Sequence, residues 1–391
     1  MTANSKIVLH HVGGRWGNHP FPRPPAFAGD FVELLYEADI DAIAAMHEAG
    51  KDHANELIVI PACLADGDGA HLCRKSCQYR RPDRGAPRRL PQGGICDVGI
   101  IEHLFEAYRF DCVVHFAAES HVDRSILSPQ SFLRTNIEGT YVLVEAARRA
   151  WQGEAGHRFI HVSTDEVFGD LAPGDPPFAE TSPYRPSSPY AASKASADHL
   201  VRAWQRTYGL PAIVINSGNN YGPWQFPEKL IPLMILSAIE NRELPVYGDG
   251  LQVRNWLHVS DHCRAINAVI ERGEVGSTYL VGGDSALPNL EVVRRICQAV
   301  DAELGRAAGT SEKLIRHVTD RPGHDRRYAV NSSFIRDSLD WHPLEQFEIA
   351  LPALVRWYLQ HKDWADTVRT GAYRRNFERQ YKGRILGTMS P

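Results

Sequence analysis

Strand-like and helix-like segments alternate along the chain from about residue 95 onward, and this alternation restricts the fold more than any other feature. Apolar runs with the length of buried strands occupy residues 112–116, 159–163 and 212–216. Helical spacing of apolar residues is found over 97–108 and 131–150, and again from about 188. Repeated strand–helix–strand units predict a parallel sheet covered on both faces. Ligands of such sheets bind beyond the carboxyl ends of the strands.

Two expectations concern details of individual helices, namely a shared face and an N-cap. In the helix over 131–150 we expect Ile137, Tyr141 and Val144 to share one face, because residues three or four apart lie on the same side of a helix. Farther along the chain, Ser260 precedes a helical pattern. Serine is a preferred residue just before a helix, so we expect Ser260 to be its N-cap.

The second half of the chain predicts an additional lobe. Helical patterns dominate residues 222–251 and 285–375, with few strand signals apart from 313–318, whereas 277–281 has the pattern of a strand that rejoins the sheet. We therefore expect a Rossmann-type, doubly wound parallel sheet with a smaller, mainly helical substrate-binding lobe. The predicted boundaries are 1–221 and 252–284 for the dinucleotide-binding domain, and 222–251 and 285–391 for the lobe.

Composition excludes several classes of protein. Of the 391 residues, 43% are hydrophobic and 23% charged, which argues against a disordered chain. No apolar run reaches the roughly 18 residues needed to cross a bilayer, and we expect no signal peptide and no membrane partner. The net charge of -4 argues against nucleic acid as the main partner.

Seven cysteines, an odd number in a long chain, favour reduced thiols and a cytoplasmic location over a disulfide framework. Zinc is an alternative for one cluster of them, but its spacing matches no common zinc finger, so we expect no metal site. The cluster consists of Cys63, His71, Cys73 and Cys77.

The first 94 residues differ from the rest. Strand-like pieces lie at 6–9 and 56–60, and the proline-rich run 19–25 between them fits neither a helix nor a central strand. Residues 74–89 are strongly basic. They are either a patch for an anionic partner or a solvated loop, and we favour the loop.

Two neighbouring carboxyl groups follow a predicted strand directly. Asp165 and Glu166 come after Ser163 and Thr164, at the carboxyl end of the strand over 159–163. Consecutive residues that leave a strand point in different directions, so these carboxyls could address two atoms of one substrate. One could act as an acid and the other as a base if their environments separate their pKa values. An exposed turn without a role is the alternative.

Tyr190 and Lys194 form a second constellation, four residues apart on the helix that begins near 188. Residues at this spacing share a helix face, and a nearby ammonium lowers the pKa of a tyrosine. Tyr190 could then remove a proton from a sugar or alcohol hydroxyl, while Lys194 could also hold a cofactor ribose. Such a pair is often accidental, but its position one helix after a strand-end Ser-Thr makes it more specific.

These motifs resemble the dTDP-glucose 4,6-dehydratase family, within the extended short-chain dehydrogenase/reductases. The resemblance runs from Ile95 to near the C-terminus, and the Asp-Glu pair distinguishes it from the related epimerases. It implies a cytoplasmic, NAD-dependent hydro-lyase that forms homodimers through a helix bundle. The matching segments are 117–125, 163–169, 188–196, 219–223, 226–232 and 321–328.

The resemblance also implies a mechanism. Tyr190 takes the proton of the glucose 4-hydroxyl as NAD accepts hydride from C4, and Thr164 hydrogen-bonds near that hydroxyl. Glu166 removes the C5 proton, and Asp165 protonates the 6-hydroxyl so that it leaves as water. Hydride then returns to C6, which gives dTDP-4-keto-6-deoxyglucose.

Further contacts are implied residue by residue. Lys229, Arg254 and Arg321 suit the two phosphates of a nucleotide sugar, where cations and bidentate donors are needed. On the cofactor side the resemblance places Ala117, Ala118, Ser120, Thr135, Tyr190, Lys194 and Asn220. On the substrate side it places Ser120, Thr164, Asn219, Lys229, Leu230, Pro245, Val246, Tyr247, Arg254, Asn289, Asp320, Arg321, Pro322, Gly323 and His324.

The N-terminal part departs from the family pattern. The family opens with a glycine-rich strand–turn–helix, in which backbone amides approach the NAD pyrophosphate. Here the glycine spacing over Gly13, Gly14 and Gly17 differs, and prolines from Pro20 onward prevent the helix. Either a diverged cradle binds NAD, or codons 10–94 are translated out of frame. The enrichment in Arg, Pro, Gly and Cys favours the second explanation.

A smaller departure is Asp340, which stands where the family commonly has glycine. Three functions remain open from the sequence. The first is an active dTDP-glucose 4,6-dehydratase, and the second is another nucleotide-sugar dehydratase or an epimerase. The third is a nucleotide-sugar binding protein without a working NAD site.

Overall fold

The structure is a computed structural model that describes residues 6–11, 57–62, 94–108 and 110–369. Several sequence features lie outside these residues, so the structure does not test the two explanations for the N-terminal part. They are Gly13, Gly14 and Gly17, the cluster Cys63, His71, Cys73 and Cys77, and the basic stretch 74–89.

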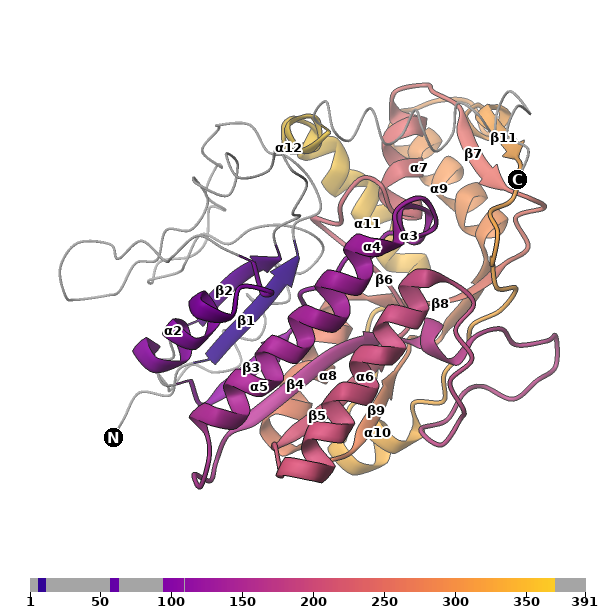
Figure 1. Cartoon of the computed structure of the whole chain (residues 1–391). Coiled ribbons are helices and arrows are strands. Elements are labelled where there is room, and N and C mark those ends of the chain that lie inside the picture. Colours follow the sequence, from indigo (N-terminus) through magenta and orange to yellow (C-terminus); the bar gives the residue numbers. More distant parts are fainter. Residues whose placement is uncertain (1–5, 12–56, 63–93, 109, 370–391) are drawn as a thin grey trace.

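Within the described residues, six parallel strands form the central sheet in the order β2-β1-β3-β4-β5-β9 (Figure 1). This order is typical of a doubly wound sheet, and it confirms the predicted fold class. The two strand-like pieces near the N-terminus form its first two members. The strands are β1 (Lys6–His11), β2 (Leu57–Ala62), β3 (Cys112–His115), β4 (Arg158–Thr164), β5 (Ala212–Ser217) and β9 (Thr278–Val281).

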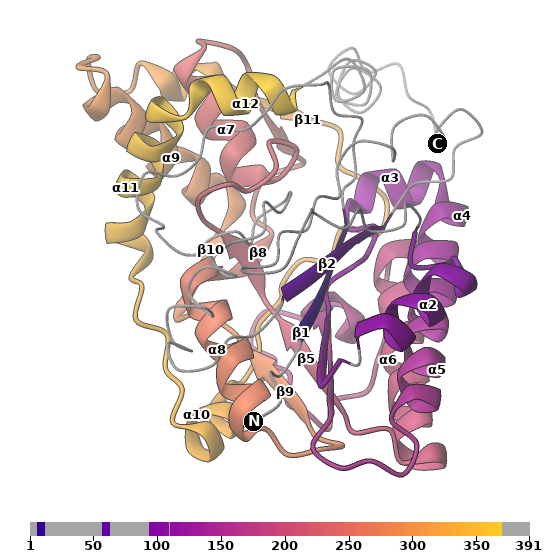
Figure 2. The ribbon, with the colours of Figure 1, turned by 90° about the vertical axis from the view of Figure 1, so that its left-hand side faces the viewer.

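Helices cover both faces of this sheet because its strands are apolar on both sides. Val113 packs toward α2, α5 and α6, whereas its neighbour Val114 packs toward α8 and α10. This alternation follows from the two-residue period of a strand. Figure 2 shows the two helical layers on opposite sides of the sheet. The helices are α2 (Val98–Tyr108), α5 (Thr140–Ala150), α6 (Pro189–Tyr208), α8 (Val259–Arg272) and α10 (Ser333–Leu339).

The helix expected over 131–150 is divided. Its first part is α4 (Pro129–Phe132), followed by the π-helical segment η3 (Leu133–Gly139) and then by α5. A π-turn contains an additional residue, which rotates the face that follows it. The expected common face is therefore wrong. Val144 is fully buried, whereas Tyr141 is 43% exposed.

A second expectation fails at the start of α8. Its N-cap is His258, whose side-chain Nδ1 accepts from the Ser260 amide at 3.4 Å. Ser260 itself lies inside the first turn. Serine is a common cap, but here the imidazole of His258 supplies the acceptor two residues earlier, and this could not be read from the serine alone.

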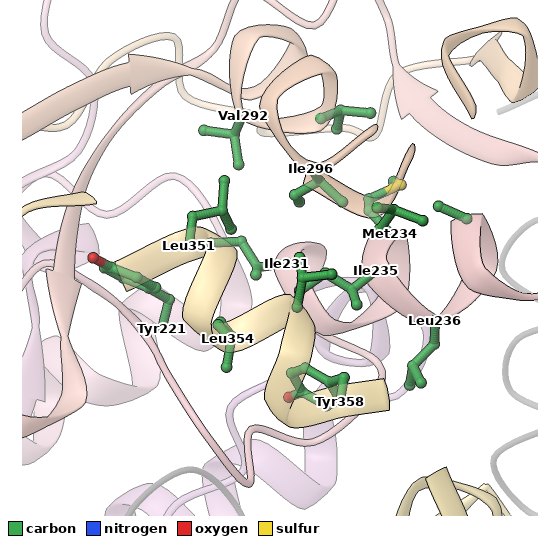
Figure 3. Packing of buried hydrophobic residues seen from close by; sticks show 14 of the residues in the cluster. Tyr221, Ile231, Met234, Ile235, Leu236, Val292, Ile296, Leu351, Leu354 and Tyr358 are labelled. Carbon is green, nitrogen blue, oxygen red and sulfur yellow. The ribbon is translucent and has the colours of Figure 1, made fainter. Parts of the chain in front are cut away.

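The second lobe lies beyond one end of the sheet (Figure 1). Its core is formed mainly by apolar side chains of the lobe helices, including Met234, Ile296 and Leu354, which interlock in Figure 3. The lobe helices are α7 (Leu230–Ile239), α9 (Asn289–Glu303), α11 (Phe347–Gln360) and α12 (Lys362–Val368).

A small sheet with the order β10-β8-β6 joins this lobe to the main sheet. A second small sheet, in which β11 pairs with β7 in parallel, packs on the lobe core. Trp256 of β8 packs in the lobe core, and its neighbour Leu257 packs in the core of the main sheet. The strands are β6 (Asn219–Tyr221), β7 (Leu244–Tyr247), β8 (Val253–His258), β10 (Ser285–Pro288) and β11 (Ile315–Val318).

Over the described part of the chain, no helix has both the length and the apolar character that crossing a membrane requires.

Candidate active site

The carboxyl ends of three neighbouring strands present the predicted site residues. Ala117 and Ala118 follow β3, Thr164 ends β4, and Asn219 begins β6 shortly after β5. Because the strands are parallel and adjacent, these ends meet at one edge of the sheet, next to the lobe.

The carboxyl pair lies on a single helical turn. Thr164 is the N-cap of η4 (Asp165–Phe168), and its hydroxyl accepts from the Glu166 amide at 3.2 Å. Asp165 is buried, with 1% of its surface exposed, and its Oδ2 has no hydrogen-bond partner within the described residues. The exposed turn without a role is therefore not what the structure shows.

The two carboxyl groups experience different charges. Burial and the neighbouring charge of Glu166 raise the pKa of Asp165 to about 8. Burial also raises the pKa of Glu166, but the cations Arg321, Arg254 and Lys229 all act to lower it. Asp165 is thus suited to carry a proton at neutral pH, whereas Glu166 is surrounded by charges that favour its ionised form.

Tyr190 lies beside this pair because α6 begins there. The Ser188 hydroxyl caps the helix by accepting from the Ala191 amide at 3.1 Å, and Pro189 occupies the first helical position. The hydroxyl of Thr164 lies near the phenol of Tyr190 and acts to lower its pKa. Thr164 therefore lies next to both the tyrosine and the carboxyl turn.

The expected effect of Lys194 on Tyr190 is not seen. Burial, followed by the negative charges of Glu166 and other carboxylates, raises the pKa of Tyr190 above its usual value. The lysine ammonium lies deeper, where it donates to the carbonyl oxygen of Val162 at 2.9 Å. Desolvation and nearby carboxylates therefore outweigh the lysine in the protein alone.

Three predicted phosphate-binding cations lie around the same place. Lys229 Nζ donates to the Ser120 carbonyl at 2.9 Å and to its hydroxyl at 3.2 Å. Arg254 is buried over the ring of Tyr328, 4.3 Å from its centroid. Arg321 reaches Asp123 at 3.4 Å, and its Nε is buried without a partner among the described residues.

The remaining substrate-side positions fall into two groups. The segment 320–324 is tied to the residue before β8, because Asp320 accepts from Gln252 at 2.8 Å, and within the segment Asp320 contacts His324 at 2.6 Å. Tyr247 donates to Asp123 at 3.1 Å, whereas the side chain of Val246 is buried in the lobe core.

The other positions occupy helix starts or a tight turn. Leu230 and Asn289 are the first residues of α7 and α9, and Pro245 lies in β7. Gly323 has φ of 64° and lies so close to the Ser187 carbonyl that a Cβ atom would stand 2.5 Å from it. Pro322 next to it is exposed.

A group of residues that the sequence reasoning missed lies beneath Lys194. Asp198 and His161 are both fully buried, and their side chains are 3.2 Å apart. Asp198 follows Lys194 by four residues and Tyr190 by eight, so helical spacing alone placed it on the same face. That spacing was the signal available in the sequence.

Curated proteins of one family match most of the chain. A family model described as GDP-mannose 4,6 dehydratase matches residues 74–352. The dTDP-glucose 4,6-dehydratase of Salmonella typhimurium is 52% identical over 303 residues, covering 74% of this chain and 84% of that protein. That of Neisseria meningitidis serogroup B is 56% identical over 292 residues, covering 72% and 82%. The chain belongs to the dTDP-glucose 4,6-dehydratase family.

Solved structures agree with this membership. DesIV, a dTDP-glucose 4,6-dehydratase from Streptomyces venezuelae solved with NAD bound, has a TM-score of 0.72 at 36% identity and covers 93% of this chain and 99% of its own. UDP-glucose 4-epimerase of Thermus thermophilus has a TM-score of 0.67 at 22% identity, covering 91% and 99%, and shares the fold.

The described residues of this family member fit a dinucleotide on the sheet edge. Ala117 and Ala118 are small and buried at the end of β3, where a bound dinucleotide must come close to the backbone. Asn220 has a buried side-chain oxygen without a hydrogen-bond partner in the described part of the chain, which a ligand donor could satisfy. Thr135, buried within η3, and Lys194 are further cofactor-side positions, beside Ser120 and Tyr190 described above.

Proposed function

We propose that the chain converts dTDP-glucose to dTDP-4-keto-6-deoxyglucose and water, as an NAD-dependent 4,6-dehydratase. The observation that carries this proposal is the Asp165–Glu166 turn at the end of β4, where Asp165 is buried and Tyr190 lies near the Thr164 cap. An epimerase needs one proton-transfer group at this place, whereas loss of water also needs a base for C5 and an acid for the 6-hydroxyl.

The first step concerns the 4-hydroxyl. Tyr190 removes its proton, and Thr164 donates a hydrogen bond near the same oxygen. NAD, when bound, supplies a hydride acceptor that later gives the hydride back, and its nicotinamide ring carries a positive charge that favours the ionised phenol. Lys194 holds the cofactor ribose from below the tyrosine. The sugar then carries a 4-keto group.

The second step removes water. The 4-keto group makes the C5 proton acidic, and Glu166 takes it while Asp165 delivers its proton to the 6-hydroxyl. The pKa of Asp165, about 8, keeps this proton available at neutral pH. Glu166 returns a proton to C5 after C6 has been reduced, so the sugar loses one water in total.

The substrate lies against the lobe. Lys229, Arg254 and Arg321 hold the two phosphates. When the substrate binds, these cations donate to phosphate oxygens in place of their present partners. Asn219 and Asn289 each have a buried side-chain oxygen without a hydrogen-bond partner among the described residues, and these are acceptors for sugar or base donors. The proposed division of the chain is 1–221 with 252–284 for NAD, and 222–251 with 285–391 for the nucleotide sugar, although α10 within the last range packs against the main sheet.

We infer that the protein is a cytoplasmic homodimer. Three exposed apolar side chains lie on neighbouring elements: Leu133 on η3, Tyr141 on α5 and Tyr208 on α6. Helices that present such side chains support a helix-bundle interface. Cys96 and Cys297 are thiols, which fits a reducing compartment. Neither a nucleic acid nor a membrane is a partner in this proposal.

The test is the mass of the nucleotide sugar after incubation with the full chain and excess NAD. A panel of dTDP-glucose, GDP-mannose and UDP-glucose is incubated separately. We expect dTDP-glucose to lose one water faster than the other two. Unchanged dTDP-glucose, or faster loss of water from another member of the panel, would contradict the assigned substrate.

A further inference from the structure

A cluster of buried polar groups lies beneath Lys194, away from the proposed substrate atoms. Asp198 Oδ1 is 3.2 Å from His161 Nε2, and both side chains have no exposed surface. The second oxygen of Asp198 accepts from the Tyr184 hydroxyl at 2.7 Å and from the Asn216 amide at 3.0 Å. Burial raises the pKa of Asp198, but His161 and the ammonium of Lys194 outweigh it and lower this pKa to about 2, so the carboxylate stays ionised.

This cluster reaches the site by two routes. Lys194 Nζ is 3.5 Å from His161 Nε2, the same nitrogen that contacts Asp198. The Asn216 amide bridges Asp198 and the backbone carbonyl of Thr164, each at 3.0 Å. Asp198 is therefore linked to both the lysine and the strand end that carries the carboxyl turn.

The cluster also balances a buried charge. Lys194 is 3% exposed, and desolvation lowers its pKa to about 8, with Asp198 the carboxylate that opposes this shift. The other titratable groups around Lys194 are histidines on the sheet and Tyr190 on its own helix. The pKa of His161 is lowered to about 4 and that of His115 well below its usual value, so neither ring carries a charge at neutral pH.

The Nε2 atom of His161 lies near both Asp198 and Lys194, but it can form a hydrogen bond with only one of them at a time. A neutral ring nitrogen either donates or accepts. If Nε2 carries the proton it donates to Asp198, and the ammonium of Lys194 then donates to the Val162 carbonyl, as observed at 2.9 Å. His161 thus fixes the spacing between the carboxylate and the ammonium.

We propose that Asp198, with His161 and Asn216 as its links, is a positioning residue for the dehydration: it keeps Lys194 charged and in place, and holds the Thr164 end of β4. The inference rests on the proposed function for its link to catalysis, but the charge state of Lys194 does not depend on turnover. Asp198 contacts no substrate atom, so it acts through Lys194 and Thr164.

The primary test measures Lys194 directly. The full chain is labelled with ¹³Cε-lysine, the Lys194 signal is assigned with Lys194→Arg, and its titration is followed by NMR without NAD or substrate. In Asp198→Asn we expect the midpoint to fall by about one pH unit or more, since the opposing carboxylate is lost. The control is Asp301→Asn, another buried carboxylate, held by Ser311 at 2.6 Å in the lobe. It should leave the Lys194 midpoint unchanged.

The second test uses His161, in case Asp198→Asn does not fold. His161→Gln keeps a nitrogen donor for Asp198, whereas His161→Leu does not. We expect His161→Leu to lower kcat by about 10-fold to 100-fold, with KM for dTDP-glucose changed far less. His161→Gln should retain most of the activity. A merely structural role would instead lower thermal stability and weaken dTDP binding in both variants alike.

The outcomes separate this inference from the proposed function. An unchanged Lys194 midpoint in Asp198→Asn, or equal loss of kcat in the two His161 variants, overturns the inference even if the parent protein dehydrates dTDP-glucose. If the parent protein has no activity and the midpoint falls as expected, the charge-holding role stands and the proposed function fails.

Discussion

At the scale of single residues, burial and local charge decide which group gives and which takes a proton. Asp165 and Glu166 are chemically alike and adjacent, yet Arg321, Arg254 and Lys229 oppose the raised pKa of Glu166, whereas Arg254 opposes that of Asp165. In the proposed mechanism this difference in surroundings, rather than a difference in residue chemistry, suits one carboxyl to act as the acid and the other as the base.

This difference has a consequence for stability. The pKa of Asp165 is about 8 in the folded protein, and in the unfolded chain it has its ordinary value of 3.8. The folded state holds this proton more tightly, so unfolding at neutral pH releases it. The free energy of unfolding therefore falls as pH rises from about 4 to about 8.

Asp165→Asn removes this titration. We expect the variant to be more stable than the parent protein at pH 7, by about 1–3 kcal/mol, and to gain little at pH 4. Urea unfolding at the two pH values measures the difference. An equal change at both values would mean that Asp165 is ionised in the folded protein.

Residue types and spacing predicted the carboxyl pair and the Tyr190–Lys194 pair from the sequence. The pKa of Tyr190 was not predictable in the same way. It depends on how deeply the phenol is buried and on carboxylates from other elements, Glu166 above all. Desolvation is a property of the packed structure, whereas helical spacing is a property of the sequence.

At the scale of elements, most helices and strands agree with their sequence patterns, and the differences have local causes. The pattern over 131–150 is helical throughout, but the π-helical segment η3 rotates the face of α5 after it. This turn brings Asn136 against α6 and the β3 loop, where its amide donates to Ser193 at 2.8 Å and to the Glu119 carbonyl at 3.0 Å. Such long-range partners could not be read from spacing within one helix.

The end of α10 shows a residue in a backbone conformation that suits glycine. Asp340 has φ of 50° and ψ of 41°, the left-handed region, and its surface is exposed. This is the position where the resemblance in sequence has glycine, and the geometry explains that preference.

Asp340→Gly should therefore stabilise the protein, by about 0.5–1 kcal/mol, because glycine adopts this conformation without steric cost. The matched control is Asp337→Gly, an exposed aspartate inside the same helix. It should destabilise the protein by a similar amount. Chemical denaturation measures the stability of both variants. A loss of stability in Asp340→Gly would contradict the steric cost that we assign to the backbone conformation of Asp340.

At the scale of the whole molecule, strand–helix alternation was enough to predict the parallel sheet and a helical lobe. The way in which the lobe is connected to the main sheet was less predictable. β8 lies between β6 and β10, so one short strand contributes to the cores on both sides. Pairings between strands of different lobes depend on tertiary packing, which the local pattern does not contain.

The exposed apolar side chains on η3, α5 and α6 predict the assembly state. Tyr141→Glu places a charge in the proposed helix-bundle interface, and we expect it to shift the protein from dimer to monomer. Sedimentation velocity measures the shift. Leu344→Glu, at a residue that is 70% exposed between α10 and α11, is the control and should leave the dimer intact. A monomeric parent protein would contradict the proposed interface.

The division of labour between Tyr190 and the carboxyl pair is the central claim, and one single-turnover experiment tests it most directly. The full chain is mixed with NAD and dTDP-glucose, and reduced nicotinamide and loss of water are followed together in Tyr190→Phe and Glu166→Gln. We predict that Glu166→Gln forms reduced nicotinamide but releases no water, whereas Tyr190→Phe does neither. Equal loss of the first step in both variants would contradict the assigned roles.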